Sequence, residues 1–96
     1  MDLVLTANSI VVASLDQVSC ELGQEAAILN LSTSVYYGLD SVGARVWGLL
    51  QKPHRVTDLR QALVTEYDVD PAQCEHDLIV LLGRMREEGL IEVKHG

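Results

Sequence analysis

The spacing of apolar residues changes near the middle of the chain. Between residues 25 and 39 apolar and polar side chains tend to alternate, whereas residues 41–88 repeat apolar positions every three or four residues. A period of two is typical of strands, and a period near 3.6 is typical of helices. The pattern predicts a β half followed by a helical half, with the aromatic stretch 35–39 at the boundary.

The β half contains several candidate strands. The β-branched run at residues 10–13 predicts a first strand. Residues 17–22 fit a strand or a turn of helix equally well. Residues 25–31 predict a strand, and the short hydroxyl side chains at 32–34 predict a turn. The stretch 35–39 then returns as the partner strand of an antiparallel hairpin.

The two faces of these strands differ. In the strand at 25–31, one face carries Ala27, Leu29 and Leu31. The opposite face carries Ala26, Ile28 and Asn30. In the strand at 35–39, Tyr37 shares a face with Leu39 and is expected in the core. Tyr36 then points outward, where an exposed aromatic ring favours either a partner or cross-strand packing, in equal measure.

Three helices are predicted after residue 39. The first begins at Asp40 or Ser41 as N-cap and runs to about residue 51, and the second begins at residue 57. The third begins at Pro71, behind the N-cap Asp70, and ends at Gly89. Residues 52–55 interrupt the helical pattern between the first two helices. Residues 90–93 predict a short last strand.

Each helix has an apolar stripe that is expected to face the core. The predicted stripe residues are Val42, Val46, Trp47 and Leu50; Leu59, Ala62, Leu63 and Tyr67; and Leu78, Leu81, Leu82 and Met85. Five consecutive apolar residues at 78–82 leave Ile79 and Val80 outside the stripe. This excess fits either a peptide groove or a helix wrapped on several sides.

The order of elements predicts an α+β fold in a single domain of residues 1–96. The expected architecture is winged-helix-like, with an N-terminal three-stranded antiparallel sheet followed by a three-helix bundle. The last strand of the hairpin has no later partner and carries neither Lys nor Pro. Such an edge is a candidate for the addition of an extended peptide.

Charge narrows the function. The formal net charge is −7, and the basic residues form no run, which argues against nucleic acid and anionic membranes as partners. No stretch is long and apolar enough to span a membrane, and the first residues do not resemble a signal peptide, so the cytoplasm is expected.

Catalytic chemistry finds little support. His54, His76 and His95 are scattered without metal-ligand spacing, and no phosphate loop or nucleophile motif is present. Cys20 and Cys74 are expected to be small buried or half-buried residues without a redox role. The sequence therefore predicts no enzyme, no catalytic residue, no cofactor and no metal.

Three blocks of the sequence resemble the PqqD-like family, the RiPP recognition elements. These blocks are AILNLSTSVYYGLDSVGARVWGLL, VTDLRQALVTEYDVD and DLIVLLGRMREEGLIEV, in matching order and spacing over residues 25–93. The resemblance is greatest to the standalone proteins of lasso peptide pathways. Residues 1–23 match weakly, which leaves the pairing of the first strand open.

The resemblance implies a function and a site. Such proteins bind the leader of a ribosomally made precursor peptide, which adds to the last hairpin strand, rests against the third helix and is delivered to a separate cysteine leader peptidase, with a cyclase as a possible further partner. The positions that correspond here are Val35, Tyr36, Tyr37 and Gly38, with Asp77, Leu78, Leu81, Arg84 and Met85. Of these, Leu78, Leu81, Met85 and the Tyr37 ring are expected to form an apolar slot, with Asp77 and Arg84 at its rim.

Two other functions share the predicted helices. A winged-helix nucleic-acid-binding regulator would need a basic recognition helix, whereas the third helix carries Arg84 and Arg86 against four acidic residues. A purely structural subunit of a larger enzyme would not bind an isolated leader peptide.

Overall fold

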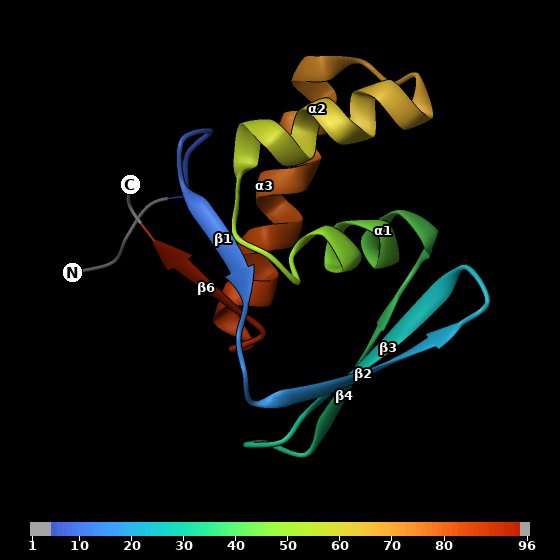
Figure 1. Ribbon diagram of the computed structural model, residues 1–96, viewed down its shortest axis with the longest axis vertical. Helices are drawn as coiled ribbons and strands as arrows, with labels where there is room; N and C mark the ends of the chain where they lie inside the picture. The colour runs from blue at the N-terminus through green and yellow to red at the C-terminus, as the bar shows by residue number, and fades with distance from the viewer. Residues whose placement is uncertain (1–4, 95–96) are drawn as a thin grey trace.

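Two three-stranded antiparallel sheets and three helices make up residues 5–94, which the computed structural model of the chain describes (Figure 1). The strands are β1 Ile10–Ala13, β2 Gln17–Leu22, β3 Glu25–Asn30, β4 Val35–Leu39, β5 His54–Arg55 and β6 Ile91–Lys94. The helices are α1 Ser41–Leu49, α2 Val56–Tyr67 and α3 Pro71–Glu87. The predicted α+β class is confirmed.

The first sheet has the strand order β2-β3-β4. Residues 17–22, which the pattern left undecided, form β2 and pair with β3 along their whole length. Ala26, Ile28 and Asn30 share one face of β3, as the alternation predicts, and all three are buried. Figure 1 shows α1 between this sheet and α2, and α1 packs against β3 and β4 on the inner face of the sheet.

The second sheet shows the pairing of the first strand, which the sequence left open. β1 lies between β5 and β6, with Val11 opposite both Val93 and His54. The strand at the start of the chain therefore pairs with the strand at its end, and not with the hairpin. The strand β5 was missed because it has only two residues, too few for a sequence period.

The helix ends follow local chemistry. An Asp40 side-chain oxygen accepts a hydrogen bond from Gly43 N at 2.8 Å, and Asp70 accepts one from Gln73 N at 2.9 Å. Gly89 has φ of +73° and follows Glu88, the C-cap residue of α3. These caps are as predicted, whereas α1 ends two residues early and α2 begins one residue early.

The core lies among the three helices, β1, β3 and β6. Its buried residues are Val11, Ile28, Val46, Trp47, Leu50, Val56, Leu59, Leu63, Cys74, Leu78, Leu82, Met85, Leu90 and Ile91. Three predictions were wrong, because Val42, Tyr67 and Cys20 are exposed. None of the helices within residues 5–94 is long and apolar enough to cross a membrane.

Candidate functional site

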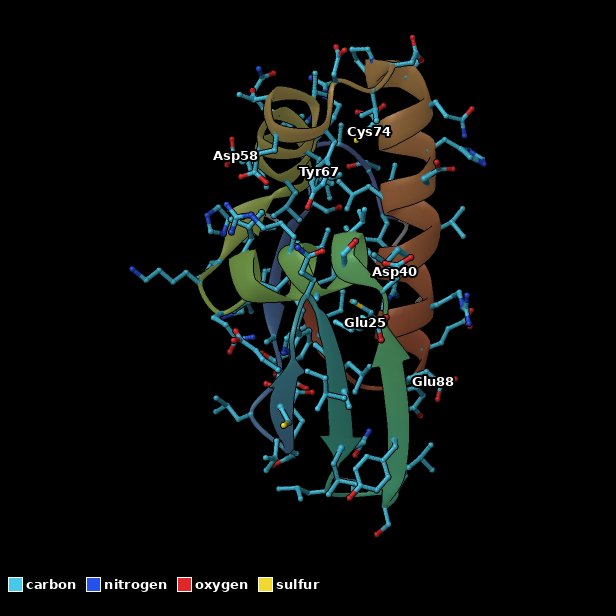
Figure 2. The ribbon with its side chains drawn as sticks, turned by 90° about the vertical axis from the view of Figure 1, so that its right-hand side faces the viewer. Glu25, Asp40, Asp58, Tyr67, Cys74 and Glu88 are labelled. Carbon is cyan, nitrogen blue, oxygen red and sulfur yellow. The ribbon has the colours of Figure 1, made fainter. Side chains whose placement is uncertain are left out.

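A groove of about 790 Å³ lies between β4 and α3 and continues against α1 and α2. Figure 2 shows β4 beside α3, with Asp40 above the strand and Glu88 near the lower end of the helix. The groove is lined by Gly38, Leu39, Asp40, Val42, Gly43, Val46, Leu63, Tyr67, Val69, Asp70, Gln73, Cys74, Asp77, Leu78, Leu81 and Arg84.

The strand β4 is an open edge of its sheet. It pairs with β3 on one side, and no other strand within residues 5–94 pairs with its far side. The backbone N–H and C=O groups on that side can pair with an extended peptide. All strand pairs of the described residues are antiparallel, which is also the slightly more stable arrangement per residue.

The floor of the groove is apolar and its rim is charged. Val46, Leu63 and Leu78 are buried, and Leu39 and Leu81 are half-buried. Asp40, Asp70, Asp77 and Arg84 lie among the exposed lining residues. This arrangement can take one or more apolar side chains of a peptide that has polar groups on either side.

A polar contact joins β4 to α3 beyond the lower end of the groove. The Tyr37 hydroxyl donates a hydrogen bond to the Glu88 carboxylate. The Asn30 Nδ2 donates another to the Glu88 carbonyl oxygen at 2.8 Å. The hydrogen bond to the Glu88 carboxylate raises the pKa of Tyr37 above its usual value of 10.0, with smaller contributions from burial and from the charge of Glu88. These bonds fix the distance between strand and helix at one end.

The predicted site residues fall into two groups. Gly38, Asp77, Leu78, Leu81 and Arg84 line the groove. Val35, Tyr36 and Tyr37 lie on β4 but not among the lining residues, and Tyr37 reaches α3 through Glu88.

Met85 lies below the groove. Its side chain is only 3% exposed and packs in the core. A direct contact between Met85 and a peptide therefore stays a prediction.

Several lining residues carried no usable sequence signal. Val42 and Tyr67 lie on stripes that the helical period assigns to the core, and Asp40 and Asp70 are explained by their caps. Cys74 lines the groove from the core side, and burial raises the pKa of its thiol above the usual 9.0. Outside the lining, Glu88 carried no sequence signal for the hydrogen bond that it accepts from Tyr37.

Within residues 5–94 no group of three or more His, Cys, Asp or Glu side chains is placed to hold a metal ion. The geometry is that of a surface that can hold an extended chain.

Comparison with known families gives the same picture. The family model described as Coenzyme PQQ synthesis protein D (PqqD) matches residues 25–91, most of the chain. This chain belongs to the PqqD family. No curated protein matches it in sequence.

Three solved structures share the fold of this PqqD-family chain. TbiB1, solved in complex with the TbiA(beta) leader peptide, is 36% identical, with 84% of this chain and 94% of TbiB1 covered and a TM-score of 0.80. A lasso peptide synthetase B1 complexed with its leader peptide is 21% identical, with 85% and 96% covered and a TM-score of 0.76.

The third structure is the PqqD truncation of Methylobacterium extorquens PqqCD, described as a stand-alone RiPP recognition element. It is 19% identical, with 92% of this chain and 94% of that chain covered and a TM-score of 0.76. The resemblance to RiPP recognition elements of lasso peptide pathways is thus confirmed.

Proposed function

We propose that this protein binds the leader segment of a ribosomally synthesised precursor peptide by strand addition to β4. The observation that carries the proposal is the open edge of β4 beside a groove with an apolar floor. The leader-bound state of TbiB1, at 36% identity, supports it. In this proposal the chain is not an enzyme, and it holds the leader while a separate cysteine leader peptidase, and then a cyclase, act on the precursor.

Physical magnitudes support useful affinity. Each main-chain hydrogen bond to β4 contributes about 0.5–1.5 kcal/mol net. One or two apolar side chains on the groove floor contribute about 1.5–3 kcal/mol each. Ordering a disordered leader costs about 2–5 kcal/mol. Toward the favourable end of these ranges the sum is compatible with a dissociation constant between roughly micromolar and tens of nanomolar. Holding the leader raises the effective concentration of the cleavage site at the peptidase.

The test is a titration of the fluorescein-labelled TbiA(beta) leader peptide, which is bound in the structure of the 36% identical TbiB1, read by fluorescence anisotropy. Leu81→Asp places a charge on the groove floor, and we expect it to weaken binding by about tenfold or more. Val80→Asp is the matched control, since Val80 is the next residue of α3, is 51% exposed and does not line the groove. Equal affinity of the two variants would count against the groove. Met85→Asp is unsuitable, because a charge among core residues unfolds the chain.

Binding of the wild-type protein also separates the rival functions. A structural subunit shows no affinity for the isolated leader. A nucleic-acid binder shows salt-dependent affinity for duplex DNA, which the net charge of −7 opposes. The peptidase step has its own readout: the cleavage rate of the precursor by the purified peptidase, with and without this chain. We expect the rate to rise with this protein and to stay low with Leu81→Asp.

A further inference from the structure

The charged side chains of the groove are unevenly distributed along its length. Within residues 5–94 its charged lining residues are Asp40, Asp70, Asp77 and Arg84. Asp40 and Asp70 precede α1 and α3, Asp77 lies in the first half of α3, and Arg84 lies in the last turn of that helix. The end of the groove near Asp40 is therefore acidic, and the end toward Glu88 carries the guanidinium of Arg84 (Figure 2).

Asp77 and Arg84 lie on the same face of α3. They are seven residues apart, which is two helical turns, so about 10 Å of helix axis separates them. The buried Leu78 and the half-buried Leu81 line the groove between these two charges. The wall that α3 contributes therefore presents a negative charge, an apolar surface and a positive charge, in that order.

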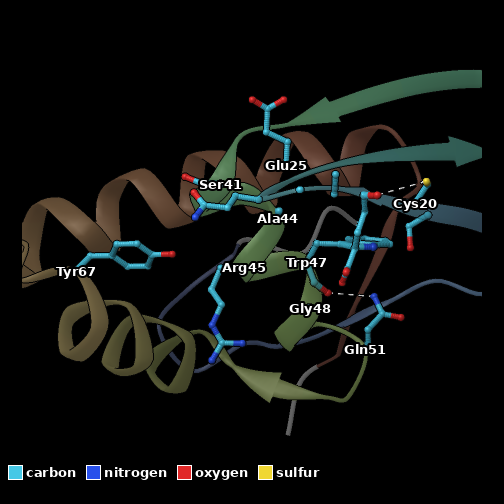
Figure 3. A pocket seen from close by; sticks show the side chains of 14 residues that line it. Cys20, Glu25, Ser41, Ala44, Arg45, Trp47, Gly48, Gln51 and Tyr67 are labelled. Atoms are coloured by element: carbon cyan, nitrogen blue, oxygen red, sulfur yellow. Dashed lines mark hydrogen bonds between the residues drawn. The ribbon is translucent and has the colours of Figure 1, made fainter.

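Neither charge has a counter-ion in the described part of the chain. Asp77 accepts a hydrogen bond from the neutral Gln73 amide at 2.9 Å, and within residues 5–94 Arg84 has neither a hydrogen bond nor an ion pair from its side chain. Arg45 differs, because it lies at a separate hollow beside α1 and is bound to Glu66, with 2.7 Å between Nη2 and Oε1 (Figure 3). The charges of Asp77 and Arg84 are therefore available to a ligand.

The strand β4 and the helix α3 run in opposite directions. Tyr37 of β4 bonds to Glu88 at the C-terminal end of α3, whereas Asp40, just after β4, lines the groove with Asp70, just before α3. A peptide strand that pairs antiparallel with β4 consequently runs parallel to α3. Its N-terminal end lies at the acidic end of the groove.

The spacing of the two charges fits an extended chain. Side chains of a strand that face α3 alternate with those that face away, so every second residue of a bound peptide faces the helix. Four residues of strand rise about 13 Å, and the long side chains of Lys, Arg and Glu can make up the difference from about 10 Å. A peptide residue midway between the two charged ones then faces Leu78 and Leu81.

We infer that the groove selects leaders by the order of their charges. A basic residue lies at Asp77, an apolar residue follows two positions later, and an acidic residue lies at Arg84 two positions after that. This inference rests on the proposed leader binding and adds a specificity to it. Asp40 and Asp70 cap their helices and also strengthen the negative potential at the end that receives the basic residue.

The test is a charge scan of the TbiA(beta) leader, in which each residue is replaced in turn by Lys and by Glu. The dissociation constant of each peptide is measured by fluorescence anisotropy at low ionic strength. We expect one position at which Lys binds about fivefold more tightly than Glu, and a second, four residues nearer the C-terminus, at which Glu binds about fivefold more tightly than Lys. Both preferences should shrink in molar salt, where charges are screened within about 3 Å.

Charge reversal in the protein assigns each position to its residue. Asp77→Lys should reverse the preference at the first position only, and Arg84→Glu should reverse it at the second position only. Glu92→Lys and Lys94→Glu are the controls, because they change the net charge equally, are exposed on β6 and do not line the groove. Each readout is a ratio between two peptides on the same protein, so a loss of stability in a variant does not imitate a reversal.

The outcomes separate this inference from the proposed function. If the leader binds but no position distinguishes Lys from Glu, or if the variants leave the preferences unchanged, the charge order is wrong and leader binding stands. The same holds if the acidic position precedes the basic one, since the peptide would then run parallel to β4. If none of the peptides binds, the proposed function itself fails.

Discussion

The Tyr37 hydroxyl of β4 donates a hydrogen bond to the Glu88 carboxylate at the C-terminal end of α3. Strand and helix are far apart in the sequence, and the groove lies between them. Because Asn30 of β3 binds the carbonyl oxygen of the same glutamate, the end of α3 is tied to two strands. The width of the groove therefore depends on Glu88, an exposed residue.

Loss of the Tyr37–Glu88 hydrogen bond, which tethers β4 to α3, should weaken leader binding. Tyr37→Phe and Glu88→Ala remove the two ends of the same hydrogen bond, so we expect each to raise the dissociation constant by about three- to tenfold. The double variant should be no weaker than the single ones. Glu87→Ala is the control, because Glu87 precedes Glu88 and makes no hydrogen bond to β4 among the described residues. If Glu87→Ala and Glu88→Ala bind the leader with equal affinity, the tether does not set the width of the groove.

The same tether gives a pH dependence at the alkaline end. The Tyr37 pKa is raised in the folded state, so the proton is held more tightly there than in the unfolded chain. The stabilisation is complete below the usual tyrosine pKa and is lost as pH rises through the raised value. We expect the melting temperatures of wild type and Tyr37→Phe to differ at neutral pH and to converge above that value.

Glu66 should make the stability of the fold depend on pH in the acidic range. Its pKa is lowered chiefly by the hydrogen bonds from Arg45, so the ion pair stabilises the folded state above the usual carboxyl pKa of 4.5. This stabilisation is lost as pH falls through the lowered value. In thermal unfolding, Glu66→Gln should differ from wild type at neutral pH and match it once the pH falls below the lowered pKa. A difference that persists in acid would show that the ion pair is not its cause.

Two glycines should respond in opposite directions to alanine. Gly48 lies within α1 with open space at its Cβ, so Gly48→Ala should stabilise the protein by about 1 kcal/mol. Gly89 has φ of +73° and its Cβ would lie 3.6 Å from Asn30 Nδ2, so Gly89→Ala should cost about 1–2 kcal/mol. Urea unfolding of both variants measures the two changes against the same wild type.

Asn30 should be the most sensitive polar residue of the sheet. It is buried, its Oδ1 accepts from Ser32 N at 2.9 Å and Thr33 N at 3.3 Å, and its amide binds Glu88. Asn30→Leu leaves all these groups unpaired and should cost about 2–4 kcal/mol of unfolding free energy. Asn30→Asp keeps the oxygen that accepts from Ser32 N and Thr33 N and loses the donor to the Glu88 carbonyl oxygen, so it should cost less. If Asn30→Asp and Asn30→Leu lower the free energy of unfolding equally, the hydrogen bonds from Ser32 N and Thr33 N contribute little to stability.

Sequence periodicity predicted the elements that build the groove, and missed some of its lining. The helix caps Asp40 and Asp70 and the faces of β3 were predicted because each depends on residues close in the sequence. Tyr67 was assigned to the core, yet it is 40% exposed. A helical stripe indicates which side faces the protein, but it does not say how far the neighbouring elements extend. Val42 and Tyr67 lie where those neighbours end, and for that reason they line a groove.

Pairings between segments far apart in the sequence were the other limit of prediction from the sequence. The strand β5 exists because β1 lies beside it, and the partner of β1 is β6 at the far end of the chain. Glu88 received no role because nothing local connects it with Tyr37. Contacts of this kind depend on the three-dimensional arrangement, which a single sequence does not specify.

The unguarded edge of β4 also has a consequence for the behaviour of the protein in bulk. The backbone groups that can accept a guest strand can equally accept β4 of another molecule. Mutual repulsion from a net charge of −7 keeps molecules apart in dilute salt. Added salt shortens the range of that repulsion to about 3 Å at molar concentration. Concentrated protein without leader peptide should then aggregate and become turbid. Added precursor peptide should keep the protein in solution.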